Sequence, residues 1–453
     1  IRRHLIVAYA RRLRGGYPPP RDSVVKQNWT IVERFYNAEW YDSNTTLQRE
    51  EDFKERLTEA RNEWAKDDNE TATTGTATDS QPLRHISHVA THKRDPFEGL
   101  SSDLYSQVKA LFVKWQGLDA ENSVWDSAPN PFTNPNEYRK WSEAYTRWRD
   151  KLCVSGNTAY TNWRTLSSKE AGGSREFKEL EEVPWYVGLG IKGALLFPHQ
   201  LEGLNWLLYK RSKDMSCVLA DDMGLGKTIQ IISFIAAVYC STIPSQALEM
   251  AKSKPSLLTT CNQGRFPFLV VCPNSLITNW LREFAIWAPF LVVEPFHGSG
   301  DSRELQAQYG IWNGSARNAV LPSTSQLPQP LRRGKHGKTL KDLNCHVVLC
   351  TYETLITQDG LKTLNSVPLT WEYLIVDEGH RLRNDQAKLF QKLNQLKVKG
   401  RILLTGTPLQ NNIRELFTLL CFVDPRKFGD IDAFEQKYKA LDKASIEEIH
   451  TMI

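Results

Sequence analysis

The sequence predicts an α/β protein in which helices cover both faces of a parallel β-sheet, preceded by a small β-rich domain. Five short apolar runs rich in β-branched residues are typical of buried parallel strands. Helical patterns such as TIQIISFIAAVY and QAKLFQKLNQL lie between them, as alternating strands and helices require. A separate segment further towards the start of the chain is dense in tryptophan. The predicted strands are CVLA (217–220), FLVVC (268–272), HVVLCT (346–351), YLIVD (373–377) and RILLT (401–405).

Length and composition exclude several classes of protein. The 453 residues suffice for two to four domains, and 41% hydrophobic with 24% charged residues argues against a disordered chain or a coiled-coil rod. A net charge of +5 does not by itself establish nucleic-acid binding. The eight cysteines form no CxxC pair, which favours a reduced intracellular compartment. No apolar run is long enough to span a membrane, and we expect no membrane partner.

Changes in composition predict the domain boundaries. Residues 1–66 form an N-terminal region of unknown role, in which LQREEDFKERLTEARNEW has a helical pattern. A Thr-rich polar stretch at 67–82 and a Ser-, Gly- and Lys-rich stretch at 152–176 are predicted linkers on either side of a small domain at 83–151. The α/β domain then takes residues 177–453. Within it, the polar segments 241–265 and 299–341 show no clear period and are predicted to be surface insertions.

A glycine-rich loop follows the first predicted strand and leads directly into a helical run. Its sequence, DDMGLGKT (221–228), is typical of a phosphate-binding loop, although Asp221 stands where the strict pattern has its first glycine. The backbone of Gly224, Leu225 and Gly226 would wrap a phosphate at the helix N-terminus. Lys227 would reach the β- and γ-phosphates, and the Thr228 hydroxyl would bind Mg²⁺.

A pair of carboxylates at the end of another strand strengthens this interpretation. Asp377 ends the run YLIVD, at the edge of a parallel sheet where nucleotides bind, and would hold Mg²⁺. Glu378 would polarise the water that attacks the γ-phosphate. A signalling GTPase is disfavoured, because no Asn/Thr-Lys-x-Asp signal follows the loop. The combination therefore predicts an enzyme that hydrolyses the γ-phosphate of a nucleotide with Mg²⁺.

Six motifs in order resemble the Swi/Snf-type ATPases of helicase superfamily two. They are HQLEGLNWL (199–207), LADDMGLGKT (219–228), VVCPNSLITNW (270–280), TYETL (351–355), VDEGHRLRN (376–384) and LLTGTPLQNN (403–412). The resemblance implies a RecA-like first motor lobe that binds ATP and Mg²⁺ and moves along double-stranded DNA by ATP hydrolysis, without separating its strands. It implies that Gln200 contacts adenine and that Thr405, Gly406 and Thr407 couple hydrolysis to movement. The residues that it implies to face the DNA backbone are Pro273, Asn274, Ser275, Thr351 and Tyr352.

The tryptophan-rich segment resembles a second family. The run ALFVKWQGLDAENSVWD (110–126) predicts a strand, a turn and a short strand, and it is similar to a chromodomain, which ends in a helix. Trp115 matches one position of the aromatic cage that binds methyl-lysine, but Leu118 replaces another cage aromatic and the expected strand at 84–88 offers none. We therefore favour a packing, DNA-contacting or autoinhibitory role. No earlier chromodomain is recognisable in residues 1–66.

Together the two resemblances favour a chromodomain-helicase-DNA-binding (CHD) remodeller. They imply a nuclear protein that acts on nucleosomes and histones, with other subunits of a remodelling complex as further partners. A start at Ile1 and an end before any second lobe suggest a piece of a longer protein, which alone would be weakly active or inactive. Two alternatives remain open. One is a DNA-repair or transcription-linked translocase of the same superfamily, and the other is a non-enzymatic chromatin-binding scaffold.

Overall fold

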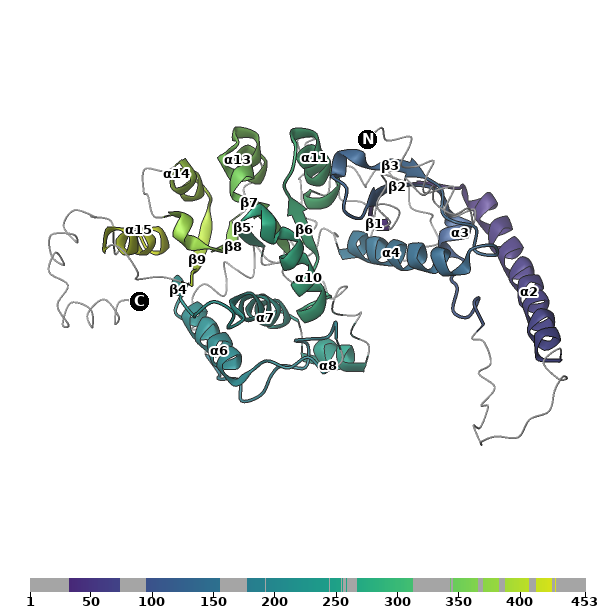
Figure 1. Ribbon diagram of the computed structural model, residues 1–453, viewed down its shortest axis with the longest axis horizontal. Coiled ribbons are helices and arrows are strands. Elements are labelled where there is room, and N and C mark those ends of the chain that lie inside the picture. Colours follow the sequence, from purple (N-terminus) through teal and green to yellow (C-terminus); the bar gives the residue numbers. More distant parts are fainter. Residues whose placement is uncertain are drawn as a thin grey trace, which may run out of the picture. The chain divides into compact units, whose positions relative to one another are not determined.

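In the computed structural model, the chain forms two compact units (Figure 1). Of the described residues, unit 1 comprises those up to 149 and unit 2 comprises those from 150 onward. The structure describes residues 32–73, 95–154, 177–191, 193–243, 245–253, 267–312, 345–365, 370–382, 388–406 and 413–425, and the single positions 255, 258, 343 and 428.

Unit 2 contains a six-stranded sheet in the order β4-β9-β8-β5-β7-β6, with every described pair parallel. All five strands expected from the sequence are confirmed. The sixth, β6, was missed because its sequence VEPF is short and contains a glutamate and a proline; proline is tolerated here because β6 is an edge strand. The strands are β4 (Cys217–Leu219), β5 (Phe268–Cys272), β6 (Val293–Phe296), β7 (Val347–Thr351), β8 (Trp371–Val376) and β9 (Val398–Leu404).

Helices cover both faces of this sheet (Figure 1). Alternate residues of a strand enter different cores: Val270 and Cys272 belong to one cluster, and Leu269 and Val271 to the other. The first cluster includes side chains of α6 (Pro198–Ser212), α7 (Lys227–Cys240) and α10 (Ile277–Trp287). The second includes side chains of α12 (Tyr352–Ile356), α13 (Gln358–Leu364), α14 (Lys388–Asn394) and α15 (Ile413–Val423). The 3₁₀ turns η4 (Asn274–Leu276) and η7 (Gly379–Leu382) follow β5 and β8.

The two predicted insertions are partly built into the fold, so this prediction was wrong for their described residues. The first contains α8 (Ser245–Ser253), whose Ala251 is fully buried in the core. The second begins with α11 (Gly300–Leu305) and the π-helix η5 (Gln306–Ile311), and the buried Ile311 and Trp312 follow. These helices are too short for a hydrophobic period to be visible in the sequence. Residues 313–342 lie outside the described residues.

Unit 1 is built on a three-stranded antiparallel sheet, β1-β2-β3, with β1 (Val32–Trp40), β2 (Val108–Trp115) and β3 (Val124–Asp126). The strand–turn–strand prediction is confirmed, with η2 (Ala120–Asn122) in the connection. Helices α2 (Ser43–Thr73) and α3 (Asp103–Gln107) lie between β1 and β2 in the chain, and α4 (Pro135–Val154) is the expected C-terminal helix.

The pairing of β1 with β2 corrects the predicted domain boundaries. Residues 32–66 belong to the same unit as the tryptophan-rich segment, and α2 continues through residues 67–73 of the predicted linker. Composition identified a polar stretch but could not show that the strand before it returns to pair with the strand after it. The strand expected at 84–88 lies outside the described residues.

Aromatic side chains form the core of unit 1. Trp115 and Trp141 are each 1% exposed and meet edge to face, with Phe35 of β1 packed on Trp141 at 5.5 Å between ring centroids. Trp40 of β1 stacks on Trp148 of α4. Because Phe35 and Trp40 both lie on β1 and pack against tryptophans of α4, this strand is part of the aromatic core of unit 1.

A buried carboxylate ties three elements of unit 2 together. Glu372, near the start of β8, has a side chain that is 2% exposed. Its Oε1 lies 3.2 Å from Nη2 of Arg211 in α6, and its Oε2 lies 2.8 Å from Nζ of Lys399 in β9. Removing the central charge leaves the guanidinium of Arg211, whose side chain is 13% exposed, beside a neutral amide, and taking the carboxylate from a nearly buried cation is costly.

We therefore expect Glu372→Gln to destabilise unit 2 by about 3 kcal/mol. The matched control is Glu249→Gln, which removes a carboxylate that is 68% exposed and pairs with Lys252 on α8. That change should cost about 0.5 kcal/mol or less. Urea unfolding followed by tryptophan fluorescence measures both, and equal losses in the two variants would contradict the buried-network interpretation.

Candidate functional site

Three loops from neighbouring strands meet at one edge of the sheet in unit 2. The loop 220–226 follows β4, the pair Asp377 and Glu378 follows β8, and the turn at Thr405 and Gly406 follows β9. Contacts join the first and third of these loops: Thr405 N donates to Leu219 O at 3.2 Å, and a Cβ on Gly406 would lie 2.7 Å from Cγ of Met223. Asp377, at the end of the neighbouring β8, is close enough to the first loop to interact with the charge of Lys227. The sequence-predicted phosphate loop, carboxylate pair and coupling turn are thus brought together. Thr407 lies outside the described residues.

The glycine-rich loop has the backbone geometry of an anion cradle. Gly224 and Gly226 have φ values of 87° and 83°, which favour glycine because a side chain would strain the backbone. Gly226 is also the N-cap of α7 and supplies no side chain to the first-turn N–H groups. Those groups and the helix dipole are therefore directed at whatever the loop encloses. Leu225 is exposed, and Thr228 is half-buried in the first turn.

The loop holds its own lysine. Lys227 Nζ donates to the carbonyl oxygens of Asp221 at 2.7 Å and Asp222 at 3.0 Å. A bound phosphate would compete with these neutral acceptors, and a charged oxygen binds an ammonium more strongly than a carbonyl does. The lysine is thus kept beside the helix N-terminus.

Gln200 contacts the loop from α6, where it is 4% exposed. Its Oε1 accepts from Phe197 N at 3.0 Å, and its Nε2 donates to Leu225 O at 3.2 Å. Nε2 of His199 also lies 3.1 Å from Leu225 O. The sequence did not single out His199. In this structure, both polar atoms of the Gln200 amide bond the protein backbone.

Asp377 is a buried carboxylate with two fixed donors. Its side chain accepts from Trp280 Nε1 at 2.9 Å and from Glu378 N at 2.9 Å, and only 8% of the residue is exposed. Burial raises the pKa of Asp377, while the bond from Trp280 and the charge of Lys227 act in the opposite direction. Glu378 has φ of 52°, a left-handed conformation that is uncommon for glutamate and strains the backbone beside the carboxylate.

These residues fit a nucleotide with its metal ion. Positive φ at two glycines leaves room for phosphate against the backbone, and a Cβ at Gly226 would overlap the Gln200 amide. A carboxylate whose pKa is raised by burial gains most from a nearby cation, because the cation restores its ionised form. Lysine, hydroxyl and carboxylate groups are the donor set that phosphoryl-transfer sites use.

The residues expected to face DNA divide into two groups. Asn274 and Ser275 are exposed in the turn that follows β5, as a contacting surface requires. Pro273, Thr351 and Tyr352 are buried, so the expectation that these side chains face a surface was wrong for this structure.

Local hydrogen bonds explain the burial of Thr351 and Tyr352. Thr351 is the N-cap of α12, and its hydroxyl accepts from Thr354 N at 3.2 Å. The Tyr352 hydroxyl donates to the carbonyl oxygen of Asp377. Tyr352 and Trp280 are thus supporting side chains of the carboxylate, and the sequence contained no signal for either role.

In unit 1, the position of Trp115 does not suit a ligand cage. The ring is 1% exposed and packs against Trp141, so a methylated lysine has no open ring face to approach. Trp125 of β3 is 42% exposed and stacks on Phe112 at 5.4 Å between ring centroids. The proposed cage position is therefore a core position.

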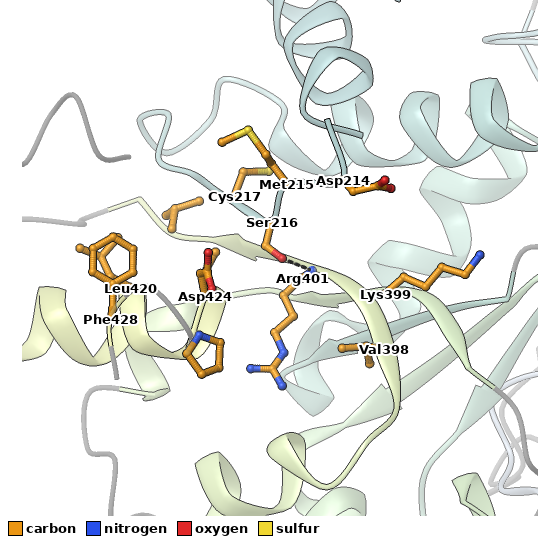
Figure 2. Close-up of a pocket in the computed structure, with 13 residues that line it drawn as sticks. Asp214, Met215, Ser216, Cys217, Val398, Lys399, Arg401, Leu420, Asp424 and Phe428 are labelled. Atoms are coloured by element: carbon orange, nitrogen blue, oxygen red, sulfur yellow. Dashed lines mark hydrogen bonds between the residues drawn. The ribbon is translucent and has the colours of Figure 1, made fainter. Parts of the chain in front are cut away.

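A cavity of about 640 Å³ lies at the opposite edge of the sheet in unit 2 (Figure 2). Residues 214–216 before β4, the start of β9 and the end of α15 line it, and Arg401 N donates to Ser216 Oγ at 3.0 Å across it. None of the sequence-predicted site residues lines this cavity. Because β4 and β9 begin there and end at the phosphate loop, the cavity and the candidate site are separate.

The family model of the SNF2-related domain matches residues 199–453, which include every one of these loops. The chain belongs to the SNF2-related family. A second family model, the MIT1 Chromo domain, matches residues 86–150. This SNF2-related chain also contains, in its described residues, no helix long and apolar enough to cross a membrane.

Curated relatives of this SNF2-related chain include chromatin-remodelling factors, one of which is of the CHD3 type. The chain is 32% identical over 343 residues to the CHD3-type chromatin-remodeling factor PICKLE of Arabidopsis thaliana, with 75% of this chain and 21% of that protein covered. It is 33% identical over 350 residues to chromatin remodeling factor mit1 of Schizosaccharomyces pombe, with 77% and 20% covered. The chain thus spans about a fifth of the length of these relatives.

Another relative is the chromodomain-helicase-DNA-binding protein 3 homolog of Caenorhabditis elegans, which is 30% identical over 358 residues, with 75% of this chain and 18% of that protein covered. Among solved structures, the Sulfolobus solfataricus SWI2/SNF2 ATPase core in complex with dsDNA is 27% identical, with 61% of this chain and 45% of that chain covered and a TM-score of 0.40. The resemblance to CHD-type Swi/Snf ATPases is confirmed by the family models and these relatives.

The pH dependence of stability tests the environment of Asp377. Because its pKa is raised on folding, the stability that this side chain contributes is full below its unfolded pKa and is lost as pH rises through the folded pKa. Asparagine does not titrate. We therefore expect the Tm difference between wild type and Asp377→Asn to move in favour of the variant as pH rises above about 4, the ordinary pKa of an aspartate. A difference that stays constant across this range, measured by thermal unfolding, would contradict the raised pKa.

Proposed function

We propose that this chain carries the ATP-hydrolysing lobe of a DNA-dependent motor that remodels chromatin. The observation that supports this most directly is the meeting of the phosphate loop, the buried carboxylate and the 405–406 turn at one sheet edge. Membership of the SNF2-related family and the likeness to CHD3-type remodelling factors support the same function. Nuclear location and action on nucleosomes are part of this proposal.

The proposed roles follow from the contacts at the site. Gly224, Leu225 and Gly226 offer backbone N–H groups to the phosphates, and Lys227 leaves its two carbonyl partners to bind phosphate oxygens. Mg²⁺ supplies charge that offsets the developing negative charge during phosphoryl transfer. The Thr228 hydroxyl and the Asp377 carboxylate are its proposed ligands. Glu378 orients and deprotonates the attacking water, and Gln200 positions the loop in addition to its proposed contact with adenine.

Movement along DNA is proposed to begin at the contact between Met223 and Gly406. A change in the loop on hydrolysis would reach the end of β9 directly, because these two residues touch. The exposed Asn274 and Ser275 are the proposed contacts to the backbone of double-stranded DNA. Unit 1 is proposed to act through packing, DNA contact or autoinhibition, because Trp115 is buried in its core.

Two variants test the ATPase proposal with different outcomes. Lys227→Ala should weaken the binding of a fluorescent ATP analogue with Mg²⁺ by about 10-fold or more, because it removes a charge-assisted bond to phosphate. Glu378→Gln should bind normally but lose DNA-stimulated phosphate release by about 100-fold or more, because it removes the proposed general base. The control is Lys252→Ala, which removes a lysine of α8 whose side chain is 49% exposed.

The outcomes separate the competing functions. Comparable DNA-stimulated hydrolysis by Glu378→Gln and wild type, in this chain or in a longer one, would overturn the assigned role. No nucleotide binding by the wild type would favour a chromatin-binding scaffold.

A further inference from the structure

The phosphate loop of this protein begins with a charged residue. Asp221 stands where the strict loop pattern has glycine, and a carboxylate beside the phosphates of a nucleotide would repel them. Its Oδ2 accepts a hydrogen bond of 2.9 Å from Nε2 of Gln230 on α7. The carboxylate is therefore held towards the buried side of that helix.

Gln230 lies deep in the core, with 0% of the residue exposed. The neighbouring Ile231 and Ile232 are also fully buried, and the helix packs on α6. A Cβ on Gly203 of α6 would overlap Oε1 of Gln230, so the glutamine side chain fills the space that this glycine leaves. Oε1 has no hydrogen-bond partner within the described part of the chain. The amide nitrogen thus makes the polar contact that an apolar residue of this size could not replace.

The hydrogen bond between Gln230 and Asp221 is linked to a second one, which holds Lys227. The backbone carbonyl of Asp221, on the residue that Gln230 holds, accepts the bond from Lys227 Nζ at 2.7 Å. A shift of residue 221 would therefore move the carbonyl that holds the lysine as well as the carboxylate. Any effect of Gln230 on a bound nucleotide would therefore pass through the position of Asp221.

We propose that Gln230 and Asp221 form a positioning pair, in which the glutamine turns the carboxylate away from the phosphate site and fixes the start of the loop. The pair would take the place of the glycine in the strict pattern. This inference rests on the proposed nucleotide-binding function. It requires that replacing Gln230 weakens nucleotide binding only while residue 221 is an aspartate.

Methionine at position 230 tests this dependence, because it has a similar size and shape and no hydrogen-bond donor. We expect Gln230→Met to raise the Kd for a fluorescent ADP analogue with Mg²⁺ by about 10-fold, as expected for the loss of a hydrogen bond to a charged group. Replacing Asp221 by Gly in the same chain should return the Kd to within about 3-fold of wild type, because no carboxylate then needs to be held.

A purely structural role predicts a different pattern. Methionine in an apolar neighbourhood would then change Tm at most and leave the Kd unchanged. Gln306→Met is the matched control, because Gln306 is 4% exposed in η5 and accepts from His297 N, outside the three loops of the site. It should lower Tm without changing the Kd.

Failure of the two proposals can be told apart. A wild-type chain that binds no nucleotide overturns the proposed function and this inference with it. If the wild type binds, an unchanged Kd in Gln230→Met overturns the pair alone. The same holds if Asp221→Gly with Gln230→Met stays as weak as Gln230→Met, since the loss then does not depend on the carboxylate.

Discussion

β4, β9 and β8 are neighbours in a parallel sheet, and their pairing decides where the phosphate loop, the carboxylate pair and the 405–406 turn lie. Parallel strands end at the same edge, so the loops after Leu219, Leu404 and Val376 have to meet although they are far apart in sequence. Leu219 pairs with Leu404, and the next backbone bond joins Thr405 N to Leu219 O. The register of these strands therefore places the 405–406 turn beside the phosphate loop.

Two residues at this edge of the sheet, Asp377 and Glu378, have conformations or surroundings that lower the stability of the fold. Asp377 is a carboxylate whose charged form is disfavoured by burial, and Glu378 has a backbone conformation that few glutamates adopt. The surrounding structure holds both: Trp280 and the Glu378 N–H bond the Asp377 carboxylate, and Tyr352 bonds its carbonyl oxygen. Rigid apolar cores on the two faces of the sheet supply the stability that tolerates such a site.

The sequence predicted the sheet well because buried parallel strands are continuous apolar runs, which few other elements imitate. It also predicted the meeting of the loop and Asp377, since both follow such runs. It did not predict β6, because Glu294 and Pro295 interrupt the apolar pattern of an edge strand. It placed Tyr352 on a surface because the motif alone does not show that its hydroxyl reaches the backbone of Asp377. Side-chain contacts of this kind depend on packing across the sheet.

The prediction of a domain boundary at residues 67–82 was wrong for a related reason. Composition is local, whereas the pairing of Arg34 with Lys114 and of Phe35 with Val113 joins strands separated by the whole of α2 and α3. Glu33 and Lys114 add a nearly buried ion pair at 2.7 Å between the same two strands. A chromo-like unit taken from residue 83 onward would lack the strand that carries Phe35 and Glu33. Its tryptophans would then have one side exposed to water, so the fold of this unit depends on a strand that lies before the matched region begins at residue 86.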